Sequence, residues 1–243
     1  MIPINSLTLR YGIGCFETLK VSADGHVFFL DEHLERLAFG AQICKLSIPA
    51  FDELKQQVLD FCAKNYKPML RVLRIVLTME DGVTCFIEDY FENTNPLKLQ
   101  IAIDWRIDSE SPLNAFKSFN YLKNHLAWMQ AHNDGFDDAV LLNEKKHIVE
   151  SSRSNLFFQD ANGAWCTPVL ESGCLPGIVR GHLIKHLKAH ETIIFEADLA
   201  SFVSCLATNS LIEARNVGLI DNYRFEELDL SEIKSCLKAL SKT

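Results

Sequence analysis

The stretch GCLPGIVR at residues 173–180 is the clearest local signal of the fold. Two glycines and Pro176 stand immediately before a helical pattern that extends to Leu187. Such a loop can turn successive backbone N–H groups toward one point at the positive end of the helix dipole, which suits a phosphate. The alternative is a plain turn with proline in the first helical turn, because the stretch is neither a P-loop nor a G-x-G-x-x-G fingerprint.

Two further polar segments lie at the ends of short apolar strands. TNS at 208–210 follows a strand expected at Ser204–Ala207, and such hydroxyls and amides bind anions but also cap turns. ESSRSN at 150–155 lies between two other expected strands. A half-buried Glu150 could hold a ring nitrogen protonated, although an exposed glutamate at a strand end is commoner.

Basic side chains in two other segments are candidates for chemistry. Lys117 lies between Phe116 and Phe119, and a lysine in apolar surroundings can act as a nucleophile or base, though most lysines are simply solvated. His33 and Arg36 share one face of an expected helix. A charged face is usually solvated, but the fork of a buried arginine fits phosphate oxygens.

The composition predicts an ordered enzyme-sized protein. Of its 243 residues, 48% are hydrophobic and 23% charged, which suits one large or two modest domains. The net charge of −8 argues against a nucleic-acid partner. The sequence predicts neither a signal peptide nor a membrane span, and its eight cysteines form no C-x-x-C pair, so no metal site is expected. Cytoplasm is the expected location.

Strands and helices alternate irregularly along the chain, which predicts a mixed α/β fold with α+β-type sheets. A hairpin is expected over 14–30 and a turn-like region over 81–95. The polar break DSESP at 108–112 predicts an N-terminal α/β domain over 1–110 and a C-terminal α/β domain with Lys117 over 111–243. Other strands are expected at 69–78, 97–105, 139–142, 147–149, 156–159 and 192–195, and helices from Asp31, Phe51, Asn120, Pro176 and Asp229.

Taken in order, these segments resemble the class IV aminotransferase family, the fold type IV pyridoxal-phosphate enzymes. The resemblance spans nearly the whole chain, and six blocks in the family's order are more specific than any one block. The matching blocks are YGIGCFET (11–18), LDEHLERL (30–37), KSFNYL (117–122), AVLLN with VESSRSNLF (139–143, 149–157), TP with GCLPGIVR (167–168, 173–180) and TNS (208–210).

The resemblance implies pyridoxal 5'-phosphate as cofactor, an amino compound as substrate, and two α/β domains, usually in a homodimer. Lys117 would hold the cofactor as a Schiff base and later move a proton. Glu150 would pair with the pyridine nitrogen, and Arg36 would bind the phosphate through two hydrogen bonds. The other implied phosphate contacts are the backbone N–H groups of Ile178 and Val179, and the residues Asn209 and Ser210.

Several positions depart from the family pattern. Ile13 stands where an aspartate is common, Val179 replaces a frequent threonine, and Arg153 occupies a position usually taken by a small residue. The turn TMEDG at 78–82 lacks the Arg-Gly pair of many members, whose arginine can help to hold a substrate carboxylate. The basic candidates for that task are Arg71, Arg74, Arg106 and Arg153, and the sequence does not choose among them.

The resemblance leaves three alternative functions open. The first is aminodeoxychorismate lyase, which releases pyruvate and forms 4-aminobenzoate for folate synthesis; the short chain, GCFET (14–18) and TNSL (208–211) look more like this branch. The second is an aminotransferase for branched-chain or D-amino acids, whose members are commonly longer. The third is a degenerate relative without catalysis, against which Lys117 and Glu150 argue.

Overall fold

The computed structural model of the chain describes residues 6–242, which form two compact units. The first unit contains residues 6–92, 115–120 and 238–242, and the second contains Asn93–Asn114 and Tyr121–Leu237. These are not the two continuous halves expected at 1–110 and 111–243. The chain passes between the units several times, and Lys117 falls in the first unit.

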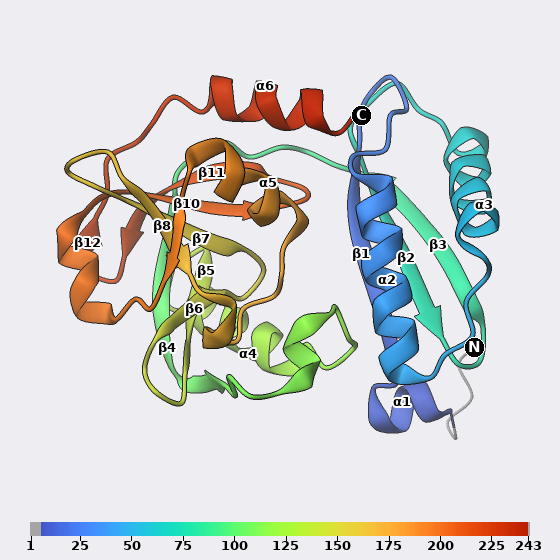
Figure 1. Cartoon of the computed structure of the whole chain (residues 1–243), viewed down its shortest axis with the longest axis horizontal. Helices are drawn as coiled ribbons and strands as arrows, with labels where there is room; N and C mark the ends of the chain where they lie inside the picture. The colour runs from blue at the N-terminus through green and yellow to red at the C-terminus, as the bar shows by residue number, and fades with distance from the viewer. Residues whose placement is uncertain (1–5, 243) are drawn as a thin grey trace. The chain divides into compact units, whose positions relative to one another are not determined.

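An antiparallel sheet with strand order β1-β2-β3 organises the first unit. The strands are β1 (Gly14–Val21), β2 (Arg71–Thr78) and β3 (Gly82–Asp89), and the helices are α1 (Leu7–Tyr11), α2 (Leu30–Cys44) and α3 (Phe51–Lys64). α2 packs on β1, and α3 contacts α2 and β3 (Figure 1). Leucine and isoleucine side chains from β1, β2 and both long helices form the core between them, as the apolar spacing predicts.

One expectation for this unit holds only in part, and another was wrong. The hairpin over 14–30 forms only as a short turn: Val21 and Val27 make an antiparallel bridge between the bonds from Ser22 N–H to the His26 carbonyl (2.9 Å) and from Phe28 N–H to the Lys20 carbonyl (3.0 Å), and no second strand follows. Residues 82–89, expected as a turn, form β3. Val83, Cys85 and Ile87 alternate along it and pack against the core, while the outer positions are polar or exposed. This edge strand is half covered, so its apolar signal was weak.

A curled mixed sheet of nine strands organises the second unit, with the order β6-β5-β4-β11-β10-β7-β8-β9 and β12 paired to β11. β4 pairs in parallel with β5 and with β11, and most other pairs are antiparallel. The strands are β4 (Leu97–Ile107), β5 (Asp138–Asn143), β6 (Ile148–Ser151), β7 (Asn155–Asp160), β8 (Trp165–Pro168), β9 (His190–Thr192), β10 (Phe202–Asn209), β11 (Glu213–Ile220) and β12 (Tyr223–Arg224).

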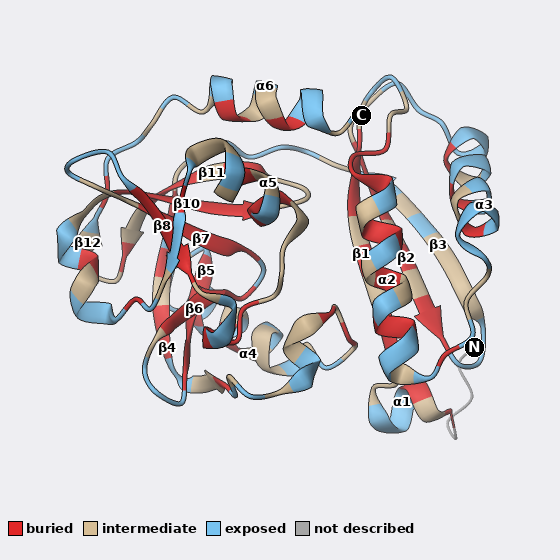
Figure 2. Ribbon diagram, in the orientation of Figure 1, coloured by how far each residue is buried: buried red, intermediate tan, exposed pale blue. Residues whose placement is uncertain are grey.

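Helices cover parts of this sheet. α4 packs on β4 and β5, and α5 packs on β10. Figure 2 shows β5 buried along its length, in agreement with its continuous apolar run. The helices are α4 (Leu122–Asn133), α5 (Ile178–Leu187) and α6 (Ser231–Leu240), with short 3-10 helices η1 (Pro112–Ala115), η2 (Leu170–Ser172) and η3 (Glu196–Ser201).

Within residues 6–242 no helix combines the length and apolar character needed to cross a bilayer. The same residues contain no group of three histidine, cysteine, aspartate or glutamate side chains placed to hold a metal ion.

Candidate active site

Lys117 is carried by a short segment that runs along the edge of β1. The amide of Phe16 donates to the carbonyl of Lys117 (2.9 Å), and the amide of Phe119 donates to the carbonyl of Gly14 (3.0 Å). An isolated antiparallel bridge lies between these two bonds. The pairing explains why residues 115–120 belong to the first unit, and it holds the Lys117 backbone on a sheet edge.

Two glycines without room for a side chain fix the same segment. Phe116 is 1% exposed, and a Cβ added at Gly40 of α2 would lie 2.8 Å from its ring. A Cβ added at Gly14 would lie 2.6 Å from the ring of Phe119. Such close approach excludes any larger residue unless the segment shifts. The aromatic residues around Lys117 therefore act as its anchors.

The Lys117 side chain is half-buried and lies beside an aromatic ring. Its Nζ is 4.8 Å from the centroid of the Phe16 ring, within the range of a cation–π contact. Burial is the main cause of the lowered pKa of His33 in α2, and the charges of Arg36 and Lys117 lower it further. The apolar surroundings expected from the sequence are thus present on one side of Lys117.

A buried network of three side chains lies on the inner face of α2. Glu17 of β1 is 1% exposed and accepts hydrogen bonds from Arg36 Nε and Nη2, both at 2.7 Å. His33 Nδ1 lies 2.6 Å from Glu17 Oε2. The two parallel bonds match the planar guanidinium to the carboxylate and fix the orientation of Arg36.

The charges in this network follow from burial and mutual attraction. Burial alone would raise the pKa of Glu17, but the charge and hydrogen bonds of Arg36, helped by His33, lower it to about 2. Burial lowers the pKa of His33 more than Glu17 raises it. The result is an ionised glutamate paired with an arginine, beside a neutral histidine.

Arg36 is predicted to bind the cofactor phosphate, and the structure also pairs it with Glu17, a partner that the sequence pattern did not indicate. The bond pair to Glu17 uses two of the five N–H donors of the guanidinium. Glu17 lies in the block YGIGCFET that was singled out, but nothing in the local pattern indicated its partner 19 residues away. Phosphate binding by Arg36 stays a prediction.

Glu150 lies at the end of β6 in the second unit and is 8% exposed. The side-chain amide of Asn155 donates to its Oε2 (3.0 Å), and so does the backbone N–H of Leu175 (3.2 Å). The Asn155 amide also donates to the carbonyl of Leu175 (3.0 Å). Glu150 is thus buried, as its neighbours suggested, and Asn155 connects it to the glycine-rich loop.

The glycine-rich loop leads directly into α5, as predicted. Gly177 is the N-cap residue, and no side chain among the described residues caps the helix there. The first N–H groups of the helix, on Ile178 and Val179, belong to the set that a helix leaves without internal partners. A Cβ at Gly177 would lie 2.1 Å from the Asn155 amide oxygen, so only glycine lets the loop pack this closely.

Asn209 closes the turn between β10 and β11. Its side-chain amide donates to the carbonyl of Arg153 (3.1 Å) and to Ser154 Oγ (2.9 Å). Its oxygen accepts from the N–H groups of Leu211 and Ile212. Because these bonds use both amide donors, any bond from Asn209 to a phosphate would come from its backbone, and the adjacent Ser210 stays a predicted contact.

The predicted site residues therefore fall into two groups, one in each unit. Lys117 and Arg36 lie in the first unit, near the Glu17 network. The second unit holds the remaining predicted residues; Asn155 connects Glu150 to the glycine-rich loop, and Asn209 is bonded to Arg153 and Ser154 of the turn between β6 and β7. The predicted residues of this unit are Glu150, Ile178, Val179, Asn209 and Ser210.

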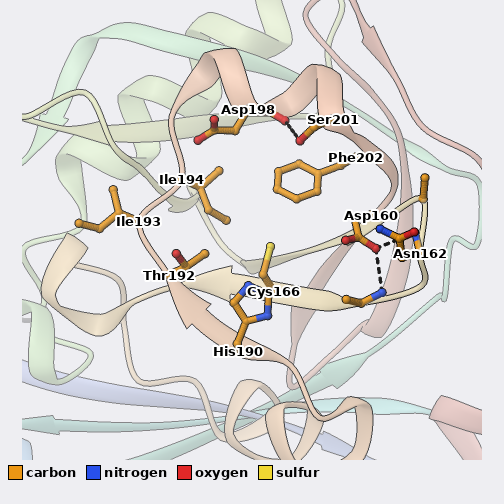
Figure 3. A pocket seen from close by; sticks show the side chains of 12 residues that line it. Asp160, Asn162, Cys166, His190, Thr192, Ile193, Ile194, Asp198, Ser201 and Phe202 are labelled. Atoms are coloured by element: carbon orange, nitrogen blue, oxygen red, sulfur yellow. Dashed lines mark hydrogen bonds between the residues drawn. The ribbon is translucent and has the colours of Figure 1, made fainter.

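A separate pocket of about 410 Å³ opens in the second unit between β8, β9 and η3 (Figure 3). His190, Cys166 and Phe202 line it, together with two aspartates. Asp160 accepts from the N–H groups of its own turn, and Asp198 accepts from the N–H of Phe195. None of the predicted site residues lines this pocket, and its carboxylates already serve local turns.

A model of the family described as amino-transferase class IV matches residues 14–220. The chain belongs to this family. The match covers every block from which the resemblance was drawn except the first three residues of the first block, and the predicted membership is confirmed.

Three relatives illustrate the range of the family. A "putative branched-chain-amino-acid aminotransferase" of Methanocaldococcus jannaschii is 30% identical, with 95% of this chain and 86% of that protein covered. The aminodeoxychorismate lyase of Bacillus subtilis is 26% identical, with 73% and 66% covered. The crystal structure of a "putative 4-amino-4-deoxychorismate lyase" from Legionella pneumophila superposes with a TM-score of 0.86 at 27% identity, covering 100% of this chain and 95% of that one.

These comparisons confirm the predicted fold class and the cofactor. This class IV enzyme depends on pyridoxal 5'-phosphate, as its family does. Its residues fit that group: the N-terminus of α5 lacks a side-chain cap, and Glu150 offers a buried carboxylate. The buried Oγ1 of Thr208, beside Asn209, also has no hydrogen-bond partner among the described residues. The phosphate and the pyridinium of the cofactor are groups of the kind these atoms would bind.

Proposed function

We propose that this class IV enzyme is an aminodeoxychorismate lyase, which converts 4-amino-4-deoxychorismate to 4-aminobenzoate and pyruvate in folate synthesis. The observation that carries the proposal is the turn after β2. The turn at 78–82 lacks the Arg-Gly pair of many family members, and its Glu80 accepts hydrogen bonds from the N–H of Leu7 (2.8 Å) and the hydroxyl of Thr8 (2.5 Å). A carboxylate committed to α1 cannot hold a substrate carboxylate.

The chemistry of the two substrate classes makes this difference informative. An α-amino acid carries its carboxylate on the same carbon as the amine, next to the proton that is removed. Aminodeoxychorismate carries its amine on a ring carbon, and its carboxylates are attached elsewhere. A lyase for this substrate therefore has no need of a carboxylate-binding arginine in the 78–82 turn, and Glu80 is tolerated there.

The chain's own residues supply the other requirements of this reaction. Lys117 carries the cofactor and, once released by the substrate amine, takes the proton from the amine-bearing carbon. Glu150 keeps the pyridine nitrogen protonated. Arg36 and the N–H groups of Ile178 and Val179 hold the phosphate. Asn209 and Ser210 are the remaining phosphate contacts. Bound pyridoxal phosphate supplies the electron sink. Loss of pyruvate from the neighbouring carbon then leaves an aromatic ring.

The proposal includes a cytoplasmic homodimer, following the family resemblance. Size-exclusion chromatography with light scattering would measure the mass against the 27.5 kDa of one chain. A mass of one chain at micromolar concentration would contradict the dimer and leave the proposed lyase reaction unaffected.

The decisive assay supplies aminodeoxychorismate to the purified holoenzyme without any keto acid. We expect 4-aminobenzoate and pyruvate in equal amounts, and no product from Lys117→Ala. Lys64→Ala, at an exposed position in α3, is the matched control and should behave like the wild type. A blank result with aminodeoxychorismate would sink the proposal.

A branched-chain aminotransferase is the second candidate, because the Methanocaldococcus jannaschii relative with that description is 30% identical over nearly the whole chain. This function predicts keto-acid-dependent consumption of leucine, isoleucine or valine. Turnover of that kind, with no 4-aminobenzoate formed, would replace the lyase proposal.

The cofactor lysine has an independent test. The purified protein should be yellow, and sodium borohydride should remove the visible absorbance band. Mass spectrometry of the reduced protein should then find the adduct on Lys117. An adduct on any other lysine would contradict the assignment, whichever reaction the enzyme performs.

A further inference from the structure

Four arginines were candidates for binding a substrate carboxylate, and two of them are committed to partners in the first unit. Arg71 of β2 is 5% exposed, forms an ion pair with Asp89 (2.8 Å) and donates to the carbonyl of Asn65 (3.1 Å). Arg74 pairs with Glu88 on the outer side of the same sheet. Both guanidinium groups therefore stabilise the β2–β3 pair.

Arg106 of β4 is also a poor candidate, for a different reason. Its Nη1 atom is buried and has no hydrogen-bond partner among the described residues. It lies in β4 next to the irregular pairing with β5, and within the described part of the chain no hydrogen bond or ion pair connects it to the predicted cofactor residues.

Arg153, in contrast to the other three arginines, is exposed and lies beside predicted cofactor residues. It occupies the turn of residues 152–154 between β6 and β7. Its backbone carbonyl accepts a hydrogen bond from the Asn209 amide (3.1 Å), and Glu150 precedes it by three residues. The backbone of Arg153 therefore lies beside residues that are predicted to bind the cofactor.

The guanidinium of Arg153 is oriented by an aromatic ring and not by an acid. Its central carbon lies 4.4 Å from the centroid of the Trp128 ring in α4. Trp128 is itself stacked on His132, with a centroid distance of 5.3 Å. Among residues 6–242 Arg153 forms no ion pair, and the nearby carboxylate of Asp138 accepts from Ser151, Ser152 and the N–H of Ala139.

This geometry prepares Arg153 to bind a carboxylate. Stacking restricts the plane of the guanidinium and leaves the N–H groups on its edges directed away from the ring. A carboxylate that binds two of those N–H groups gains charge-assisted bonds with little further loss of side-chain freedom. The small residue usual at this position in the family could not supply such a group.

We infer that Arg153 is the substrate-specificity residue of this enzyme and binds a carboxylate of the amino substrate, with Trp128 holding it in position. The inference rests on the proposed function, because aminodeoxychorismate carries its carboxylates away from the amine. It also agrees with the presence of Glu80, and not an arginine, in the turn after β2.

The test compares the wild-type holoenzyme with Arg153→Ser, Arg153→Lys and Trp128→Leu. Arg74→Ser, the loss of a partly exposed arginine in the first unit, is the matched control. The probes are 4-aminobenzoate and the uncharged 4-aminobenzamide, and isothermal titration measures their Kd. We expect the wild type and Arg74→Ser to bind the acid at least 10-fold more tightly than the amide, because two charge-assisted bonds discriminate by about 10- to 100-fold.

Arg153→Ser should abolish that preference, while Arg153→Lys should keep only part of it because an ammonium group lacks the fork. Trp128→Leu should weaken acid binding several-fold by releasing the guanidinium. In steady-state assays Arg153→Ser should raise KM by about 10- to 100-fold with a smaller change in kcat. The visible absorbance band of all variants should match the wild type, since none removes a cofactor contact.

The outcomes separate this inference from the lyase proposal. If the wild type forms 4-aminobenzoate and Arg153→Ser keeps the full preference for the acid, Arg153 is not the carboxylate residue and the lyase stands. If the wild type forms no 4-aminobenzoate, the lyase fails, and the titration is repeated with 4-methyl-2-oxopentanoate and its amide. An unchanged preference in Arg153→Ser with that pair would also overturn the inference.

Discussion

The two units bury a glutamate in different ways. Glu17 in the first unit is held by a cation, Arg36, through two bonds of 2.7 Å, with His33 beside it. Glu150 in the second unit is held by neutral donors, the amide of Asn155 and the N–H of Leu175. Loss of one partner of the Glu17–Arg36 pair would leave an uncompensated buried charge, whereas the carboxylate of Glu150 is the predicted partner of the pyridine nitrogen.

The predicted cofactor residues of the two units are supported in correspondingly different ways. The Glu17 network orients Arg36 near Lys117, which is itself fixed on the edge of β1 by Phe116 and Phe119. In the second unit, Asn155 and Asn209 connect the Glu150 strand, the glycine-rich loop and the β10–β11 turn. We therefore expect changes at Glu17 to affect stability first and changes at Glu150 to affect chemistry first.

The largest expected effect is that of Glu17→Gln. It leaves the charge of Arg36 in a largely buried site, so the free energy of unfolding should fall by about 3–5 kcal/mol. Urea denaturation followed by circular dichroism measures the loss. Glu88→Gln, which removes an exposed ion pair with Arg74, is the control and should cost less than about 1 kcal/mol.

The same pair has a defined pH dependence. The pKa of Glu17 is lowered from 4.5 to about 2, so its stabilisation is present above pH 4.5 and is lost as the pH falls toward 2. Glu17→Gln should lack this part of the acid-induced loss of stability. Equal pH profiles for the two proteins would mean that Glu17 is not the buried charge described here.

The next largest effect is that of Glu150→Gln, which should lower the catalytic rate more than the stability. Loss of a charge-assisted bond to the pyridine nitrogen should lower kcat by about 10- to 150-fold, while a glutamine of the same shape should change the free energy of unfolding by less than about 1 kcal/mol. Steady-state kinetics and urea denaturation on one preparation measure both. A large loss of stability with normal kcat would reverse the contrast between the two glutamates.

Gly40→Ala tests whether packing positions Lys117. The added Cβ would meet the Phe116 ring at 2.8 Å, so the segment around Lys117 must shift. We expect a loss of about 1–3 kcal/mol from overpacking and slower reaction of Lys117 with added pyridoxal phosphate, followed by absorbance. Gly181→Ala in α5, where no atom lies within 4 Å of the added Cβ, should be tolerated.

The smallest expected effect comes from Asp138 in the second unit, and its sign is opposite to that of Glu17. Burial raises the pKa of Asp138 above 3.8, but hydrogen bonds from Ser152, Ala139 and Ser151 offset part of that cost. A raised pKa in the folded state means that stability falls slightly as the pH rises from 3.8 through the folded pKa. Asp138→Asn should remove that slope in pH-dependent thermal unfolding, and a steeper slope in the variant would contradict it.

Much of the fold could be predicted from periodicity alone. The apolar run of β5 and the helical spacing of α2 identified buried elements correctly, because burial on one or two faces leaves a clear pattern. β3 was missed because only one face of an edge strand is covered. The expected hairpin at 14–30 is limited to a short turn and one bridge, because the apolar residues 27–30 are buried where the chain enters α2 and do not extend into a second strand.

By itself, the sequence determined the family, the cofactor and the candidate residues, because a glycine-rich loop before a helix, a strand-end glutamate and a flanked lysine recur in a fixed order. Only the tertiary structure decided which residues act together. It paired Glu17 with Arg36 across 19 positions, placed Lys117 on the edge of β1, and put Arg153 on the ring of Trp128. These contacts depend on packing between segments distant in sequence, and no local pattern of residue types encodes such packing.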